Sequence, residues 1–372
     1  MFLTLTAAAS LAIWLYLLLA RGAFWRMRPD PALAALHAPA PSVTAVVPAR
    51  NEALVVARSI ASLAAQQYPG EFQTILVDDA SQDGTASLAR AAVPTLRVVA
   101  ARPLPPGWTG KMWAVSEGAS AATGDYLLLT DADIVHPPGH LAALVARARQ
   151  GNYDMVSYMV RLQCRTLAEQ ALIPAFVFFF FLLYPPAWIR DPRRRTAGAA
   201  GGCILIRRAA LERIGGIARI RAELIDDCAL ADAVKRSGGR VWLGLSETAA
   251  SIRPYATFGE IGHMISRTAF TQLRRSPLLL AATVAGLALT YLAPPLLTLA
   301  APRGPAQGMG ALAWLLMTVA YFPAVRYATR NWFWAPLLPV ISLFYLAATL
   351  HSAFAHWRGR GGMWKGRAQS VA

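Results

Sequence analysis

Carboxylates are scarce in this chain and crowd into three places. All acidic residues lie between Asp30 and Glu260, in a chain with a formal net charge of +16. Three short clusters stand out: Asp78, Asp79 and Asp83; Asp131 and Asp133; Asp226 and Asp227. Like charges at close range repel unless a cation or strong hydrogen bonds lie between them. The clusters therefore predict a site for a divalent metal and an anionic leaving group.

The segment TDAD at residues 130–133 has the form D-x-D. Two carboxylates placed this way after a strand can hold one hard cation, Mg²⁺ or Mn²⁺, and leave coordination positions for a diphosphate. Asp131 and Asp133 are the predicted metal ligands; two solvated acids in a turn are the alternative for an isolated motif. His136 is either a further metal or phosphate contact or a loop histidine satisfied by its neighbours.

The segment VDDASQDGT at residues 77–85 supplies carboxylates and hydroxyls at a predicted strand-to-helix turn. A carboxylate there can accept a hydrogen bond from a uracil N–H or a ribose hydroxyl, and Asp79 is expected to face that ligand. Ser81 or Asp83 can cap the helix, so Asp83 is expected to be structural.

The segment VVPARNEA ends the first predicted strand, where Glu52 or the backbone at Pro48 and Ala49 could contact the same nucleotide. It is not a G-x-G-x-x-G loop, which disfavours a dinucleotide-binding fold of the oxidoreductase type.

Lys111, one of only three lysines, follows a flexible turn in GWTGKMWA at a predicted helix start. A lone ammonium beside a diphosphate is a useful point charge. A solvated surface lysine is the alternative.

Asp226 and Asp227 fall in the first turn of a predicted helix over residues 222–238. The helix dipole favours acids there, which accounts for one of them. The helix dipole does not explain why there are two adjacent acids. One of the pair could take a proton from an acceptor hydroxyl as general base. Gly201 and Gly202 would let backbone pass close to a ligand.

The elements that must position these residues follow an alternating pattern. Apolar, β-branched runs bounded by turns alternate with helical patterns, which predicts an α/β domain with a mostly parallel sheet covered on both faces. Strands are expected at residues 42–49, 73–79, 96–100, 125–133, 154–162 and 201–208, and helices at 51–66, 83–92 and 111–122. Ligands of such sheets bind at the carboxyl ends of the strands, where two of the acidic clusters fall.

Part of the chain must avoid water, because 56% of its residues are hydrophobic, 15% are charged and its mean hydropathy is +0.39. Residues 1–21 predict an uncleaved transmembrane anchor, since Arg21, Arg26 and Arg28 follow the apolar run. The positive-inside rule then puts the anchor's C-terminal end in the cytoplasm. Residues 40–260 are the predicted cytoplasmic catalytic domain.

Membrane helices are predicted over residues 277–356, followed by a basic tail at 357–372. This region holds three apolar runs, at about 277–300, 309–325 and 333–356. If the anchor and all three runs crossed the membrane, the tail would end outside, against the positive-inside rule. We expect a cytoplasmic tail, with one run re-entrant or interfacial. Residues 172–188 are interpreted as an interfacial helix, because a span there would separate the acidic clusters across the membrane. A buried core helix is the alternative.

Cys164, Cys203 and Cys228 show no C-x-x-C spacing. A disulfide framework or a structural zinc site is therefore not expected.

Taken together, the motifs resemble the inverting family 2 glycosyltransferases with a Rossmann-like GT-A fold, and most closely the hopene-associated branch of hopanoid biosynthesis. The resemblance covers nearly the whole chain. The segments that carry it are VVPARNEA, VDDASQDGT, PLPPGWTGK, TDAD, LIPAFVFFF, GGCILIRR, IDDCALA, RTAFTQL and TYLAPPLL.

The resemblance implies roles for single residues. It implies that the nucleotide sugar is bound by Pro48, Ala49, Glu52, Asp79, Lys111 and Asp131. It implies that Asp131 and Asp133 hold the metal and that Asp227 is the catalytic base, with Asp226 where many members have Glu. Processive synthases of this family carry a Q-x-x-R-W motif. Here the sequence Gln272-Leu273-Arg274-Arg275 is followed by Ser276, so the tryptophan of the motif is missing. Transfer of a single sugar is therefore favoured.

The predicted function is a membrane-bound glycosyltransferase that moves one sugar, with inversion, from a nucleotide donor, expected to be a UDP-sugar, to a lipid. A hopanoid or other polyisoprenoid is the expected acceptor, and the bacterial inner membrane the expected location. The alternatives are a processive polysaccharide synthase and a non-catalytic scaffold or lipid carrier. Nucleic-acid binding is disfavoured, because the excess positive charge lies beside the apolar runs.

Overall fold

The computed structural model describes residues 1–30, 36–329, 331–360, 363–364 and 367–368. The chain divides into two compact units. One is helical and contains Met1–Arg28, Gln163–Ala187 and Tyr255–Gly362; the other holds a sheet and contains Pro29–Leu162, Trp188–Pro254 and Met363–Ala372. Each is described by itself.

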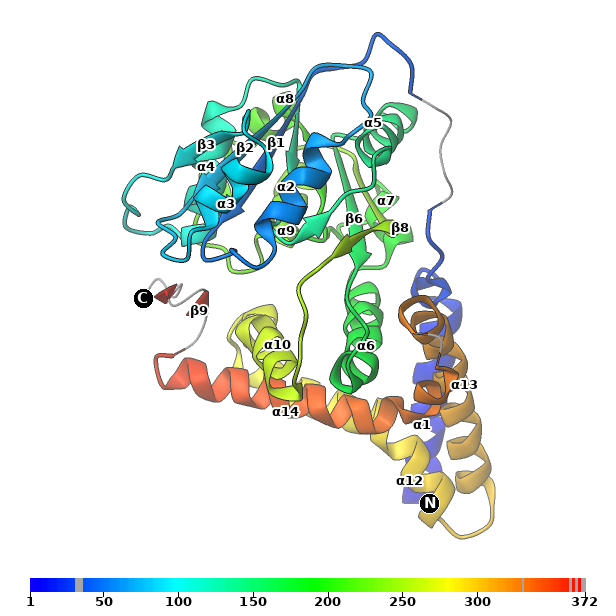
Figure 1. Cartoon of the computed structure of the whole chain (residues 1–372). Helices are drawn as coiled ribbons and strands as arrows, with labels where there is room; N and C mark the ends of the chain where they lie inside the picture. Colours follow the sequence, from blue (N-terminus) through cyan, green and yellow to red (C-terminus); the bar gives the residue numbers. More distant parts are fainter. Residues whose placement is uncertain (31–35, 330, 361–362, 365–366, 369–372) are drawn as a thin grey trace. The chain divides into compact units, whose positions relative to one another are not determined.

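The second unit is built on one eight-stranded mixed sheet in the order β3-β2-β1-β4-β7-β6-β8-β5 (Figure 1). The first four strands in this order are parallel to one another, and β7 runs antiparallel to both of its neighbours. The strands are β1 (Val43–Ala49), β2 (Phe72–Asp78), β3 (Arg97–Ala100), β4 (Tyr126–Leu129), β5 (Ile134–Val135), β6 (Met155–Arg161), β7 (Ile204–Arg207) and β8 (Val241–Ser251). The predicted α/β class with a mostly parallel sheet is confirmed.

Helices cover the sheet. They are α2 (Val56–Ala64), α3 (Thr85–Ala92), α4 (Gly110–Ala121), α5 (His140–Gln150), α8 (Arg208–Arg213) and α9 (Asp226–Arg236). All residues of β1 and β4 are buried. Burial on both faces explains why these strands are continuous apolar runs rather than alternating ones.

The loops of the site leave the sheet at one edge. Ala49 at the end of β1 is in register with Asp78 at the end of β2. The strand predicted over residues 125–133 is shorter than expected: β4 ends at Leu129, and a turn closed by the Ile134 N–H and the Asp131 carbonyl leads into β5. Asp131 and Asp133 therefore lie in a turn.

Gly118 lets α4 pack closely on the sheet. A Cβ at this position would overlap the side chain of Val46 and lie 2.9 Å from Cγ2 of Val77. Gly118→Ala should therefore lower the free energy of unfolding by about 1–3 kcal/mol through overpacking, despite a helix-propensity gain of about 0.5–1 kcal/mol. Thermal unfolding of the purified protein measures this. Gly139→Ala is the control, since its Cβ would meet no atom of the described residues within 4 Å; equal melting temperatures for the two variants would contradict the packing argument.

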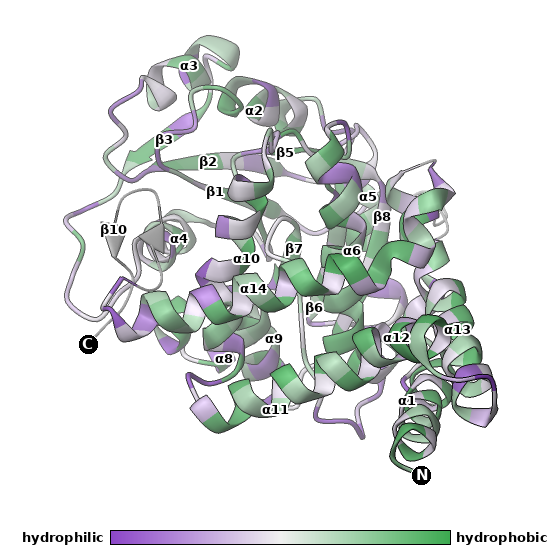
Figure 2. Cartoon of the chain, turned by 90° about the horizontal axis from the view of Figure 1, so that it is seen from below, coloured by the Kyte–Doolittle hydropathy of each residue, from purple (hydrophilic) through white to green (hydrophobic). Residues whose placement is uncertain are grey.

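The helical unit supplies the apolar part of the chain. Its longer helices are α1 (Phe2–Leu19), α6 (Leu167–Leu183), α10 (Phe258–Gln272), α11 (Pro277–Leu287), α12 (Ala293–Ala300), α13 (Pro305–Ala328) and α14 (Leu338–Trp357). Helical stretches long and apolar enough to cross a membrane are Phe2–Leu19, Leu167–Arg190, Pro277–Ala300, Pro305–Ala328 and Trp332–Trp357. Figure 2 shows hydrophobic residues along them. The apolar helices expected at the N- and C-terminal ends are therefore present, and their length and composition fit membrane anchors.

Helices α1 and α13 run in the same direction. Ala7, near the start of α1, packs against Leu297 and against Ala306 at the start of α13. Beyond the end of α1, Phe24 contacts Phe178, which contacts Tyr321 near the end of α13, with both ring-centroid distances 5.3 Å. Helix α14 lies across this pair rather than alongside it (Figure 1).

Candidate functional site

Lys111 joins three distant segments of the second unit. It lies in the first turn of α4, which Thr109 caps by accepting a hydrogen bond from the Met112 N–H at 3.3 Å. Its Nζ is 3.1 Å from Oδ1 of Asp131, in the turn after β4, and 3.2 Å from Oδ2 of Asp226, in α9. Burial opposes the charge of this ammonium, but the facing carboxylates outweigh burial and raise its pKa. Lys111 is therefore a fixed positive charge.

Asp227 is held by backbone N–H groups beside this cation. Its Oδ2 accepts from the Gly201 N–H and its Oδ1 from the Cys228 N–H, both at 2.8 Å. Burial, followed by repulsion from Asp226, raises the pKa of Asp227 to about 6, while Lys111 acts in the opposite direction. A carboxylate with such a pKa can accept a proton near neutral pH.

These residues line an open pocket with about 340 Å³ of empty space, part of which is open to solvent. Its polar side is formed by Lys111, Asp131, Asp226 and Asp227. The remaining lining is mostly apolar: Pro48, Met112, Val115, Leu129, Ile204, Ile217, Ile220 and Leu230, with Thr130 and Gly201. The structure thus brings together five of the predicted site residues: Pro48, Lys111, Asp131, Asp226 and Asp227.

Glu52 and Asp133 belong to a second ionic group, which Arg253 connects. Oδ2 of Asp133 accepts from the Ser251 hydroxyl at 2.9 Å and from Nε of Arg253 at 3.1 Å. Nη2 of Arg253 donates to both Glu52 carboxylate oxygens, at 2.7 and 2.6 Å. Burial, with repulsion from Asp131 and Glu52, raises the pKa of Asp133 although Arg253 opposes the change.

Sequence analysis did not identify Arg253. It follows β8, a strand whose apolar start VWLGL was a usable signal.

Asp79 and Asp83 lie on the loops at the ends of β1 and β2. Asp79 is 3% exposed, and its Oδ2 lies 3.7 Å from Nη1 of Arg50. Asp83 accepts from the backbone N–H groups of Ala53 and Thr85, at 2.9 and 3.1 Å, so it connects the two loops. Neither residue lines the pocket.

The donor set at Asp131 and Asp133 fits a hard divalent cation. Oδ2 of Asp131 and Oδ1 of Asp133 form no hydrogen bond with the described residues, while the opposite oxygen of each carboxylate is held by Lys111 or Arg253. Carboxylate oxygens suit Mg²⁺ or Mn²⁺. Positive charge here would also relieve the repulsion that raises the pKa of Asp133. The two free oxygens are therefore the ones available to a metal.

Part of the chain is similar in sequence to known glycosyltransferases. Residues 44–215 match the model of glycosyl transferase family 2, a stretch that includes Lys111 and Asp131 and ends before Asp226. The undecaprenyl-phosphate 4-deoxy-4-formamido-L-arabinose transferase of Aeromonas hydrophila is 36% identical over 123 residues, 32% of this chain and 37% of that protein. The protein of the same name from Pseudomonas fluorescens is 32% identical over 121 residues, 31% and 34% of the two chains. The chain thus spans about a third of the length of these relatives.

A similar fold has been solved by experiment. A mannosyltransferase from Pyrobaculum calidifontis, in complex with GDP-Man and Mn²⁺, aligns with a TM-score of 0.57 at 20% identity, over 94% of this chain and 98% of that one. Residues 44–215 are therefore similar to glycosyl transferase family 2, and the chain has the GT-A-like α/β fold that the sequence predicted.

Proposed function

We propose that the protein is a membrane-bound, inverting glycosyltransferase that moves one sugar from a nucleotide sugar to a lipid. The observation that carries this proposal is the position of Lys111 between Asp131 and Asp226, beside Asp227 in one pocket. Asp227 takes the proton of the acceptor hydroxyl, while the ammonium of Lys111 stabilises charge on the departing diphosphate. Asp226 anchors Lys111 and raises the pKa of the base.

The donor side is assigned to the loops around β1 and β2. Pro48, Ala49, Glu52 and Asp79 bind the nucleotide, which we propose to be a uridine diphosphate. Asp131 and Asp133 hold a Mg²⁺ or Mn²⁺ that supplies positive charge to the diphosphate. The GDP-Man complex of the mannosyltransferase makes a GDP-sugar the donor to test beside it.

The partly buried acids Asp226 and Asp227 favour a hydroxyl acceptor. A hydroxyl needs a base, which Asp227 with its pKa of about 6 provides. A phosphate acceptor is already ionised, and it would be repelled by Asp226 and Asp227. We therefore propose a lipid hydroxyl as acceptor, and the resemblance of the motifs makes a hopanoid polyol the first candidate. The names of the curated relatives make undecaprenyl phosphate the second candidate.

Strand pairing supports an interfacial position for α6. The chain enters α6 after β6 and returns to β7, and β6 and β7 are antiparallel neighbours, with Met155 opposite Ile206. Both ends of the segment Leu167–Arg190 must then lie on one side of the membrane. We propose that residues 172–188 lie in the interface and admit the lipid, while the sheet unit faces the cytoplasm of a bacterial inner membrane.

The helical unit supports a cytoplasmic tail. Because α13 runs parallel to α1, it returns the chain to the side where α1 ends. We propose that α14, which lies across these helices, follows the interface. The tail 357–372 then stays on the cytoplasmic side; its residues 361–362, 365–366 and 369–372, with Lys365, lie outside the described residues.

Membranes containing the protein, given labelled UDP- or GDP-sugars with a hopanoid polyol or undecaprenyl phosphate, test the proposal. One product on the polyol is expected. A ladder of products would instead identify a processive synthase, and label on undecaprenyl phosphate the second acceptor. Unchanged lipid mass spectra with and without the gene would identify a non-catalytic protein.

Chelation tests the metal. Removing divalent ions from the purified enzyme should abolish transfer, and Mn²⁺ or Mg²⁺ should restore it, because the diphosphate then regains its counter-charge. Asp133→Ala should raise the Mn²⁺ concentration needed for half-maximal rate at least tenfold, since one of the two proposed ligands is lost. Asp154→Ala, in the same unit, is the control. Full transfer in chelated enzyme would contradict the assignment.

A further inference from the structure

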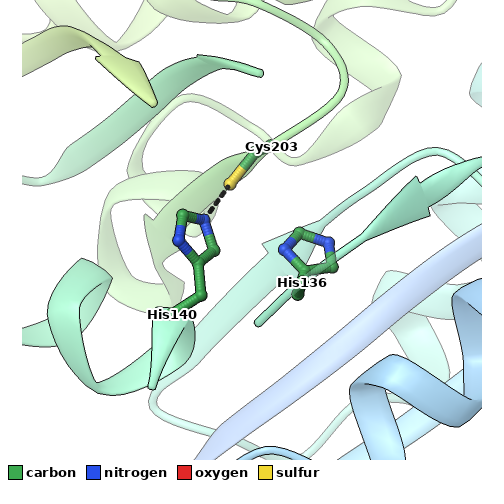
Figure 3. Close-up of side chains that lie close together, drawn as sticks. All are labelled: His136, His140 and Cys203. Atoms are coloured by element: carbon green, nitrogen blue, oxygen red, sulfur yellow. Dashed lines mark hydrogen bonds between the residues drawn. The ribbon is translucent and has the colours of Figure 1, made fainter. Parts of the chain in front are cut away.

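Three buried side chains with metal-binding atoms lie close together next to the turn that carries Asp131 and Asp133. His136 follows β5, His140 is the first residue of α5, and Cys203 precedes β7. One ligand atom from each lies within 4.8 Å of the other two. Figure 3 shows both imidazoles and the thiol directed toward a common centre, and the residues are 2%, 8% and 0% exposed.

Hydrogen bonds fix the form of His136 that a metal needs. The Thr130 hydroxyl donates to the Gly202 carbonyl at 2.8 Å, so it accepts from Nε2–H of His136 at 2.9 Å. The lone pair of this histidine is then on Nδ1, which has no hydrogen-bond partner among the described residues although it is buried. A metal-bound histidine is typically held in this way by its other ring nitrogen.

The remaining ligand atoms can also bind a metal, although burial raises the pKa of the Cys203 thiol to about 12, so that the metal itself must stabilise the thiolate. Nε2 of His140 lies 3.5 Å from Sγ of Cys203, a contact between two potential ligands. Burial lowers the pKa values of His136 and His140 to about 3 and 4, which keeps both imidazoles in the neutral form that binds metals. Two imidazoles and one thiolate select Zn²⁺ over the hard cations Mg²⁺ and Mn²⁺.

We propose that His136, His140 and Cys203 bind a zinc ion, at a site separate from the carboxylate pair Asp131 and Asp133. His136 binds through Nδ1, His140 through Nε2 and Cys203 through its thiolate, and a water completes the tetrahedron. Binding releases the Cys203 proton to solvent. The short-range C-x-x-C pattern misses such a site, because its ligands come from two segments far apart in sequence.

The position of the proposed zinc site next to the pocket indicates a structural role for the metal. Thr130 and His136 flank the turn with the two acids, and Cys203 follows the Gly201 N–H that holds Asp227. A metal that joins these segments would fix the distance between the proposed metal ligands and the proposed base. The inference does not depend on the proposed function, since it concerns metal binding alone.

The test uses the purified full-length protein, stripped of metal and given Co²⁺ or Zn²⁺ alone. A thiolate-to-Co²⁺ charge-transfer band and about one tightly bound zinc per chain are expected. Cys203→Ser should remove the band, whereas Cys164→Ser and Asp133→Asn should keep it. Thr130→Val keeps all three ligands but loses the bond that orients His136, so it should weaken zinc binding about 10–100-fold.

Circular dichroism checks that each variant is folded, and Thr130→Val decides if Cys203→Ser does not fold. No charge-transfer band in the wild-type protein, or equal zinc affinity in wild type and Thr130→Val, would overturn the proposal.

Discussion

Asp227→Asn should lower kcat for sugar transfer by about 10²–10⁴-fold, the usual contribution of a general base. The amide oxygen of Asn can accept only one of the two backbone N–H bonds that Asp227 accepts, from Gly201 or from Cys228, so one bond is lost while the similar size of the side chain should keep the shape of the pocket. The amide cannot take the acceptor proton. The KM for the nucleotide sugar should change little, because Asp227 is assigned to the acceptor. Initial rates with varied donor and acceptor measure both quantities.

Asp232→Asn is the matched control, since Asp232 lies on the same helix but pairs with Arg236 at an exposed position. Its kcat should equal that of the wild type. An Asp227→Asn enzyme with full activity would remove Asp227 from the mechanism.

The same residue predicts a pH profile. The base acts in its ionised form, so kcat/KM should rise with pH through about 6 and level off above it. Repulsion from Asp226 contributes to the raised pKa of Asp227, so Asp226→Asn should move this limb to lower pH. A limb that stays in place in this variant would assign the titration to another group.

Much of the sheet could be predicted because its strands are continuous apolar runs bounded by turns. The predicted strands over residues 42–49 and 73–79 correspond to β1 and β2. The local sequence pattern does not show which residue a charged side chain will contact in the fold. Lys111 stood out because lysine is rare here, yet its contacts with Asp131 and Asp226 arise only when three segments meet.

Arg253 is a second residue whose contacts could not be predicted from the local sequence. Arginine is common in this chain, so its residue type carried no signal. Its role as the counter-charge of Glu52 and Asp133 follows from the pairing of β8 beside β6 and β5, which is a non-local property. Likewise, hydropathy alone does not distinguish a spanning from an interfacial α6, whereas the pairing of β6 with β7 bears directly on it.

Lys111→Met should lower kcat by about 10²–10³-fold, as expected when one preorganised group that stabilises transition-state charge is removed. It should also move the acidic limb of the pH profile above 6. The reason is that Lys111 lowers the pKa of Asp227, so its removal leaves burial and Asp226 unopposed. Lys111→Arg keeps the charge but replaces a compact ammonium with a planar guanidinium, so it should restore the pH limb more fully than kcat.

Arg236→Met is the control for loss of a positive charge, because Arg236 is exposed and pairs only with its helix neighbour among the described residues. The value of kcat at high pH separates the two possible roles of Lys111. If it only neutralises carboxylates, Lys111→Met measured well above its shifted limb should regain the wild-type kcat. If it also stabilises the departing diphosphate, as we propose, the loss should persist at every pH, because deprotonating Asp227 does not replace the missing charge.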